Sequence, residues 1–403
     1  MSEQPTILAV KPYVGQDFYV PAFELYIRNK KFTLVQDVLS ISYTDSLVDV
    51  DSFDMTVNNW NPKEGGQQAT FKYSDGPNFD PWQDVELWMG YYKSGKGDWR
   101  RMLTGEITTS SVNFPSGGGS TLTVRGLNLL HRFRTQQISR PFVAKKDSDI
   151  AKELVDEIAK EVRKKVPNLE LRMDEEERAL NLANETPVPY LAMHNTYPIV
   201  FLMRRARDIG YDLSVEEEAQ GSQRIAVFRF RPSHLVRRPT YEIEWGKMLI
   251  SFQPTLQTAG QVSEVMVKGW DPQGKAKFEE VATRADLNGQ GVVQPDAIGI
   301  TEGSLAQRVE ITADRPVQTK QEAKDLAKNM LRQLTQGLVE ARGQTIGLPD
   351  LRAGCKVNIL GLGNRYSGTY LVTGTTHRMG DGGYVTDFTC RMEARTGPQG
   401  SLT

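Results

Sequence analysis

An internal duplication of short strand-like motifs constrains the fold of this 403-residue chain more than any other feature. The segment around Ile41 resembles the segment around Ile250, which lies 209 residues further on. The segment around Trp60 resembles the segment around Trp270, 210 residues further on, so one inserted residue reconciles the two offsets. Because a duplicated sequence usually folds twice in the same way, two similar units are expected within one chain.

The duplication continues through three more pairs of segments. In chain order, residues 85–90 resemble 356–361, residues 103–105 resemble 372–374, and residues 122–125 resemble 388–391. Each match alone is weak, because β-proteins reuse similar strand and turn sequences, but five matches in one order are rarely accidental. Residues 53–57 alternate apolar and polar side chains, as a half-buried strand does. The repeated units are therefore predicted to be built from β-strands.

A region of mixed helical and strand-like sequence separates the two repeats. Apolar residues recur every four positions at Ile150, Leu154, Ile158 and Val162, which predicts an amphipathic helix. A second helix is expected over residues 198–209. The region is therefore predicted to be an α/β domain inserted between the two β-units.

A further helix is predicted inside the second repeat. Thr319 and Glu322 have the spacing of a capping box. The helix has a stripe that we expect to be buried, made of Ala323, Leu326, Ala327, Met330, Leu331 and Leu334, and its Leu326, Met330 and Leu334 face is expected to pack on the second β-unit. The predicted organisation is a first β-module (residues 1–130), an inserted α/β domain (131–245), a second β-module (246–272 and 305–395) and a small insertion (273–304).

Composition and motifs give no indication of a catalytic, cofactor or metal site. The 49 Lys and Arg residues nearly balance the 50 Asp and Glu residues, whereas proteins that grip nucleic acid usually carry a basic excess. The four histidines lack metal-ligand spacing, no nucleophile elbow or phosphate-binding loop occurs, and the acidic runs 174–177 and 216–218 are typical of a solvated surface. We therefore expect a protein that is not an enzyme, with no cofactor and no specific nucleic-acid ligand.

The sequence also lacks the features of a membrane or secreted protein. No apolar run approaches the ~20 residues that span a bilayer. The N-terminus has neither the basic start nor the apolar run of a signal peptide. Cys355 and Cys390 lie in strand-like stretches and are expected to be buried thiols. Synthesis and folding in the cytoplasm are therefore expected.

Three longer motifs follow one another along the chain. Residues 124–131 read V-R-G-L-N-L-L-H, residues 201–211 read F-L-M-R-R-A-R-D-I-G-Y, and residues 323–377 comprise a helix followed by glycine-rich strands. Together they resemble the phage late control protein D and VgrG family, whose motifs read V-x-G-x-D-x-x-x-x-L and F-L-x-R-x-A-x-x-x-G-Y. Asn128 stands where that family usually has Asp, and the resemblance covers about residues 20–395.

The resemblance implies a β-rich α+β fold with two tandem tail-tube-like antiparallel β-barrel modules and inserted α/β segments. It implies a structural hub in the baseplate of a contractile phage-tail-like injection system. Such a hub is a homotrimer, so its six modules adapt a six-fold inner tube to a three-fold spike. The expected partners are a separate spike protein, inner tube proteins and baseplate wedge proteins. Assembly is expected in the cytoplasm, into a free or membrane-anchored particle.

Two alternatives remain open at this point. The tail hub of an ordinary contractile bacteriophage would have a very similar sequence, and neighbouring capsid and terminase genes would distinguish it. A baseplate-associated cell-wall hydrolase, or another β-rich carbohydrate-active enzyme, would need a pair of carboxylates in an apolar setting. No such pair is visible in the sequence.

Strand periodicity also predicts which side chains face a channel. Alternate side chains of a strand point to opposite faces, so Asp54 and Thr56 lie opposite the apolar side of their strand. In the second repeat, Glu264 and Lys268 occupy the corresponding polar side. Because a passage for cargo must be wet, we expect these four residues to face its lumen.

Overall fold

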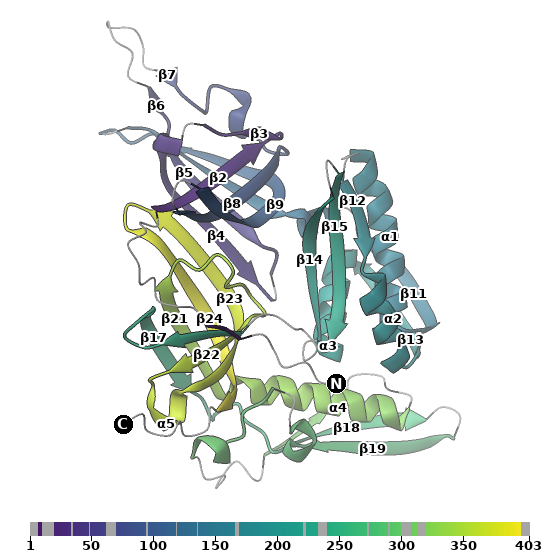
Figure 1. The fold of residues 1–403 in the computed structure, drawn as a ribbon. Helices are drawn as coiled ribbons and strands as arrows, with labels where there is room; N and C mark the ends of the chain where they lie inside the picture. Colours follow the sequence, from purple (N-terminus) through teal and green to yellow (C-terminus); the bar gives the residue numbers. More distant parts are fainter. Residues whose placement is uncertain are drawn as a thin grey trace, which may run out of the picture.

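The computed structural model contains four packed units, each with its own apolar core (Figure 1). It describes residues 7–9, 20–33, 35–47, 49–61, 70–93, 96–117, 119–134, 136–165, 169–220, 223–232, 240–271, 274–288, 291–299, 308–312, 317 and 319–395. In Figure 1 the two β-modules lie one above the other, the α/β domain lies beside them, and a helix with a small sheet lies below.

The first module is an antiparallel sheet with the order β4-β5-β10-β9-β8-β2-β3. Alternate side chains of its strands fill a core that includes Phe53, Met55 and Val57. A short separate hairpin joins β6 to β7. The strands are β2 (Val20–Ile27), β3 (Lys30–Lys31), β4 (Val38–Ser46), β5 (Ser52–Asn58), β6 (Trp60–Asn61), β7 (Thr70–Phe71), β8 (Asp84–Lys93), β9 (Lys96–Asn113) and β10 (Thr121–Asn128).

The second module repeats this order as β17-β21-β24-β23-β22-β16. One difference is that β16 runs parallel to β22, whereas β2 runs antiparallel to β8. A further strand, β1 (Ile7–Ala9), pairs with β16. The elements are β16 (Thr240–Glu244), β17 (Leu249–Leu256), β21 (Val339–Ile346), β22 (Lys356–Leu360), the short helix α5 (Gly363–Tyr366), β23 (Gly368–Gly380) and β24 (Gly383–Arg395).

The strand registers align the two modules more accurately than the sequence does. The pairing of β4 with β5 shifts between Val38 and Ser40, and the pairing of β17 with β21 shifts between Leu249 and Ser251. When these two irregularities are aligned, the residue of the second module that corresponds to Ile41 is Phe252 rather than Ile250. Exposure agrees, because Ile41 is 1% exposed whereas Ile250 is 53% exposed.

The match between Trp60 and Trp270 is wrong. Trp270 belongs to β18 (Glu264–Asp271), which pairs with β19 (Ala276–Thr283) and β20 (Val309–Thr312) in a separate three-stranded sheet. The strand that corresponds to β5 is instead β21, which follows this inserted sheet in the chain. Part of the predicted insertion, including residues 289–290 and 300–304, lies outside the described residues.

The structure is a β-rich α+β fold with one large, mostly antiparallel sheet. Each module was expected to be a closed barrel. In the part of the chain that the structure describes, β4 pairs with no strand at the other end of its module, and neither does β17. Among the described residues, the strand pairings therefore form two core-covering sheets and do not close either module into a barrel.

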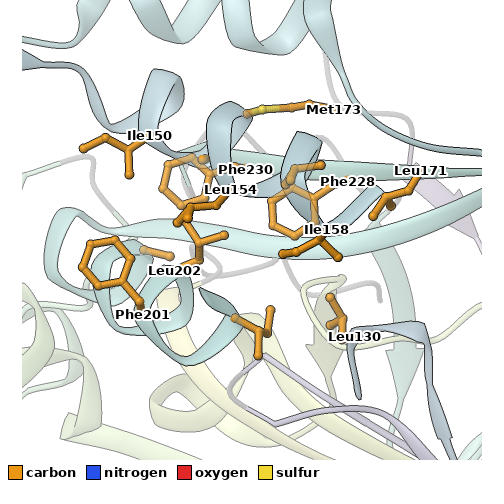
Figure 2. Packing of buried hydrophobic residues seen from close by; sticks show 14 of the residues in the cluster. Leu130, Ile150, Leu154, Ile158, Leu171, Met173, Phe201, Leu202, Phe228 and Phe230 are labelled. Carbon is orange, nitrogen blue, oxygen red and sulfur yellow. The ribbon is translucent and has the colours of Figure 1, made fainter. Parts of the chain in front are cut away.

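The inserted α/β domain follows the first module. Its predicted helix stripe is confirmed, because Ile150, Leu154 and Ile158 of α1 are buried with Phe228 and Phe230 of β15 (Figure 2). The elements are β11 (Ile138–Lys145), α1 (Asp147–Lys165), β12 (Leu169–Met173), α2 (Glu175–Asn184), β13 (Val188–Thr196), α3 (Pro198–Ile209), β14 (Tyr211–Gln220) and β15 (Gln223–Pro232).

The remaining helix, α4 (Lys320–Thr335), packs mainly on β18 and β19 rather than on the second module. Thr319 caps it as predicted, since its hydroxyl accepts a hydrogen bond from the Glu322 amide at 3.2 Å. Half of the predicted stripe is fully buried, namely Ala323, Ala327 and Leu331, while its Leu326, Met330 and Leu334 are only partly buried. Small alanines allow the helix to lie close to the sheet.

Candidate functional site at the junction of the two modules

One strand joins the two modules into a continuous sheet. The first residues of β23 pair with β22 of their own module. From Gly374 to Gly380, β23 pairs instead with β4 of the first module, with His377 opposite Tyr43. The pairing of β23 with β24 is irregular between Val372 and Gly374, at the point where β23 changes its partner. The modules are therefore joined edge to edge by a backbone ladder.

A buried ion pair lies beside this ladder. Arg352 Nε donates a hydrogen bond to Asp45 Oδ2 at 2.8 Å, and the Ala353 amide donates to the same oxygen at 3.1 Å. The Thr375 hydroxyl donates to the other carboxylate oxygen. The Arg352 guanidinium also stacks 4.4 Å from the centroid of the Tyr43 ring. Asp45 comes from the first module and Arg352 from the second, so the pair fixes one module against the other.

His377 completes the buried polar cluster on the second module. Its Nε2 lies 3.0 Å from the Leu351 carbonyl oxygen, which can only accept, so Nε2 carries the proton. Its Nδ1 then accepts hydrogen bonds from the hydroxyls of Tyr384 at 2.9 Å and Thr386 at 3.1 Å. Burial lowers the pKa of His377 to about 3, and the histidine is neutral at physiological pH. It is a structural residue of the core.

Two carboxylates near the junction have opposite pKa shifts. Burial works against ionisation of Asp45, but Arg352 and other donors outweigh it and hold the Asp45 pKa below its usual value. Burial and the neighbouring Asp45 raise the pKa of Asp51 to about 6. The Asn128 amide donates a hydrogen bond to Asp51 at 2.9 Å. Asn128, which stands where the late control family usually has Asp, therefore contacts a carboxylate whose pKa is raised.

A continuous polar face covers the side of the shared sheet that lies opposite the two cores. Hydroxyl pairs cross its strands between Thr44 and Thr376 at 3.3 Å and between Thr56 and Thr123 at 3.2 Å. The polar face consists of Ser251, Gln253 and Thr255 (β17), Glu340, Arg342 and Gln344 (β21), Asp387 and Thr389 (β24), Thr376 and Arg378 (β23), Ser40, Ser42 and Thr44 (β4), Ser52, Asp54 and Thr56 (β5), Thr121, Thr123 and Arg125 (β10), and Thr109, Ser111 and Asn113 (β9).

The structure does not bring the four predicted lumen residues together. Asp54 and Thr56 belong to the polar face, where Asp54 pairs with Arg125 at 2.9 Å. Glu264 and Lys268 lie on β18 in the separate sheet, where Lys268 pairs with Glu279 at 3.1 Å. The prediction grouped the four residues because it assigned β18 to the second module.

The Gly210 of the F-L-x-R-x-A-x-x-x-G-Y motif is explained by packing at the end of α3. Its φ of 71° is unfavourable for residues with a side chain. A Cβ at this position would also lie 1.5 Å from Arg332 Nη2, so only glycine leaves room for that guanidinium. The motif therefore marks a contact between the α/β domain and α4, and its role is structural.

The side chains that most often bind metal ions are not grouped together in the described parts of the chain. No group of three or more His, Cys, Asp or Glu side chains in these parts of the chain is placed to hold a metal ion. Cys355 and Cys390 are both buried free thiols, while His234 falls outside the described residues. No helix in the same parts is long and apolar enough to cross a membrane.

Sequence comparisons give little guidance. Residues 201–381 match a family model described as the Alg8 N-terminal domain. This range begins inside α3 and ends in the turn between β23 and β24, so it corresponds to no single folded unit and spans less than half of the chain. No curated protein matches the sequence.

Similar solved structures define the fold. The 43 kDa tail protein of prophage MuSo2 from Shewanella oneidensis has a TM-score of 0.61 at 12% identity, over 91% of this chain and 97% of that protein. A tail protein from Neisseria meningitidis MC58 has a TM-score of 0.58 at 12% identity, over 93% and 97%. The E. coli c3393 protein, a component of the type VI secretion system, has a TM-score of 0.53 at 11% identity, over 93% and 79%.

The chain therefore has the fold of phage tail proteins and of a type VI secretion component. This fold is shared almost from end to end, since the similar region spans more than nine-tenths of the chain. At such low sequence identity the likeness defines the architecture alone.

Proposed function

We propose that this protein is the structural hub of the baseplate of a contractile phage-tail-like injection system. The observation that carries the proposal is the edge-to-edge joint between two modules of the same strand order. A chain built in this way contains two adjacent segments of a ring. Three copies would supply six modules, which matches a six-fold tube on one side and a three-fold spike on the other.

Each end of the shared sheet has an edge that could continue such a ring. In the first module, β9 pairs with β8 only as far as Glu106, so residues 109–113 have a strand on one side only among the described residues. In the second module, β17 pairs with β21 on one side. In the strand order shared by the modules, β9 corresponds to β23 and β17 corresponds to β4. The two edges are therefore equivalent to the strands that join the modules within one chain. We infer that β17 of one copy pairs with β9 of the next.

The pairing of β23 with β4 within the chain also suggests the register of the proposed pairing between β17 and β9. Thr44 lies opposite Thr376 within the chain. By the alignment of the strand irregularities, Thr44 corresponds to Thr255 and Thr376 corresponds to Ser111. The proposed ladder therefore pairs Ser111 of one copy with Thr255 of the other.

Side chains at the free edges have the chemistry of an uncompleted interface. Phe252 and Leu256 of β17 and Val112 of β9 are only partly buried in the single chain, whereas Tyr43 and His377 at the internal joint are fully buried. Pairing would remove this apolar surface from water. Pro254 has no amide hydrogen, so one hydrogen bond of the proposed ladder would be absent at that position.

In the assembled ring, we propose that the polar face lines the central passage. The support is that the face is rich in hydroxyl groups and that its ion pairs, Asp54 with Arg125 and Asp387 with Arg378, balance its charge. A wet, nearly neutral wall would let cargo pass without adhering. Asp54 and Thr56 keep the role proposed for them, whereas Glu264 and Lys268 would lie away from this wall.

The remaining parts of the proposal concern partners and location. The partners are inner tube proteins above the ring, a separate spike protein below it and baseplate wedge proteins around it. The protein acts without catalysis and is incorporated into the baseplate after assembly in the cytoplasm. The tail hub of a contractile bacteriophage has the same architecture, and the presence of DNA in the particle would distinguish it.

A disulfide cross-link tests the ring. Cysteines at Ser111 and Thr255 should join neighbouring copies, because the corresponding threonines within the chain lie 3.3 Å apart at their hydroxyls. Under oxidation of assembled particles, the Ser111→Cys, Thr255→Cys double variant should give a covalent trimer on a non-reducing gel. Ser110→Cys with Thr255→Cys is the matched control, since a shift of one residue points the two side chains to opposite faces. Equal cross-linking of both pairs, or none, would refute the proposed interface.

A further inference from the structure

A cavity of about 840 Å³ lies where the two modules, the α/β domain and α4 meet. Its size is within the range of sites that hold small molecules. Five arginines line it, and three of them have partners: Arg100 pairs with Asp350 at 2.6 Å, Arg352 pairs with Asp45, and Arg101 stacks on the Trp88 ring at 4.7 Å. The other two, Arg332 and Arg391, behave differently.

Arg332 and Arg391 make no ion pair and no hydrogen bond with any other described residue through their side chains. Arg332 is 9% exposed, and its guanidinium is held against the backbone of Gly210. The Nε of Arg391 is buried without a hydrogen-bond partner. A buried guanidinium without a partner is costly, so such groups are usually found with an anion.

Carboxylates surround this pair of arginines. Asp212 and Glu393 attract both guanidinium groups, and Glu340 attracts Arg391. Glu393 is paired with Lys356 at 2.9 Å. Burial lowers the pKa of both arginines, and the repulsion from Arg391 lowers that of Arg332 further. The two guanidinium groups therefore lie near each other at the cavity wall, and the buried Nε of Arg391 has no hydrogen-bond partner.

We propose that Arg332 and Arg391 bind an oxyanion, a phosphate or a carboxylate, inside this cavity. Guanidinium groups match both anions, because their planar donors can form paired hydrogen bonds to two oxygens. The cavity is much larger than one phosphate ion, so the natural ligand would be a larger molecule that carries the anionic group. Because β14, α4 and β24 all contribute to the wall, the bound anion would also link the α/β domain to the second module.

Calorimetry and thermal unfolding with two probes test the proposal. Inorganic phosphate and citrate should each raise the melting temperature of the full chain, compared with sodium chloride at equal ionic strength. Citrate should bind more tightly than phosphate if the site prefers carboxylates, and phosphate more tightly if it prefers phosphoryl groups. Arg391→Gln and Arg332→Gln should each weaken binding at least tenfold. Arg125→Gln, which removes an exposed arginine outside the cavity, should bind like the unmodified protein.

The melting temperature without the anion provides a second test, because the proposal predicts the direction in which a substitution of Arg391 changes it. If Arg391 awaits a ligand, Arg391→Met should leave the melting temperature in sodium chloride unchanged or raise it, because the substitution removes a partly buried guanidinium whose Nε has no hydrogen-bond partner. If Arg391 is already satisfied within the fold, the same substitution should lower it. That result, or an anion-induced shift that is equal in the unmodified protein and in Arg391→Gln, would overturn the proposal.

Discussion

Replacing Asp45 with Asn should lower the free energy of unfolding more than the substitution of an exposed residue does. The Asp45 side chain is 7% exposed and that of Arg352 is 25% exposed, so the ion pair is largely shielded from water. Asn keeps the shape of Asp but not the charge, which leaves the Arg352 guanidinium without its counter-ion at the junction. The perturbation therefore tests whether this pair holds the two modules together.

The magnitude follows from the burial of the two partners. Removing one partner of a fully buried pair costs about 3–5 kcal/mol. Arg352 is partly solvated and keeps a hydrogen bond to the Met102 carbonyl at 3.0 Å, which reduces the loss. We expect Asp45→Asn to lower the free energy of unfolding by about 2–4 kcal/mol at pH 7.

Urea unfolding followed by tryptophan fluorescence gives the assay, with Asp54→Asn as the matched control. Asp54 also pairs with an arginine on the same sheet, but its side chain is 37% exposed, so its loss should cost about 0–1 kcal/mol. Because the folded-state pKa of Asp45 is lowered, its contribution is present above the unfolded pKa and is lost as the pH falls through the folded pKa. Equal costs for the two variants at pH 7 would refute the reasoning.

Three further predictions concern single residues. Asp51→Asn should stabilise the protein by up to about 2 kcal/mol at pH 7, an advantage that disappears as the pH falls from 6 to 4, because the pKa of Asp51 is raised to about 6 in the folded state; a pH series of urea titrations measures this. Leu331→Ala in α4 should cost about 2–5 kcal/mol, clearly more than Leu326→Ala, because only Leu331 is fully buried; thermal unfolding compares them. Gly210→Ala should cost at least about 1 kcal/mol, whereas Gly337→Ala should change little, since only the first combines a positive φ with a blocked Cβ position.

Periodicity in the sequence was sufficient to predict local structure where burial is regular. The spacing of Ile150, Leu154 and Ile158 gave α1 and its buried face, and Thr319 gave the start of α4. The order of short motifs indicated a duplication, and the two modules do share one strand order. Such patterns are local consequences of which face of an element is buried.

The sequence could not give the partners of each strand. Trp270 resembles Trp60 in its neighbours, yet β18 pairs within the inserted sheet, because a strand sequence specifies which face is buried and not which strand lies beside it. The same error placed Glu264 and Lys268 beside Asp54. Ile250 was matched to Ile41 because the irregular residue in each strand is invisible without the pairing.

The sequence of β4 does contain a signal for the junction. In β4, Ile41 and Tyr43 are on the buried side, and the alternation places Asp45 on that side as well. A charged residue at a buried position needs a partner, and this alone would have marked Asp45 as a residue of interest. The identity of its partner, Arg352, depends on a contact more than 300 positions away in the chain and had to come from the structure.

A three-dimensional reconstruction of assembled particles tests the central claim most directly. The account predicts three copies of this chain in one ring between tube and spike, with six modules around the axis, β17 of each copy beside β9 of the next, and Asp54 on the inner wall. A ring of six copies, a single copy at the baseplate centre, or a ring with the polar face turned outward would contradict it.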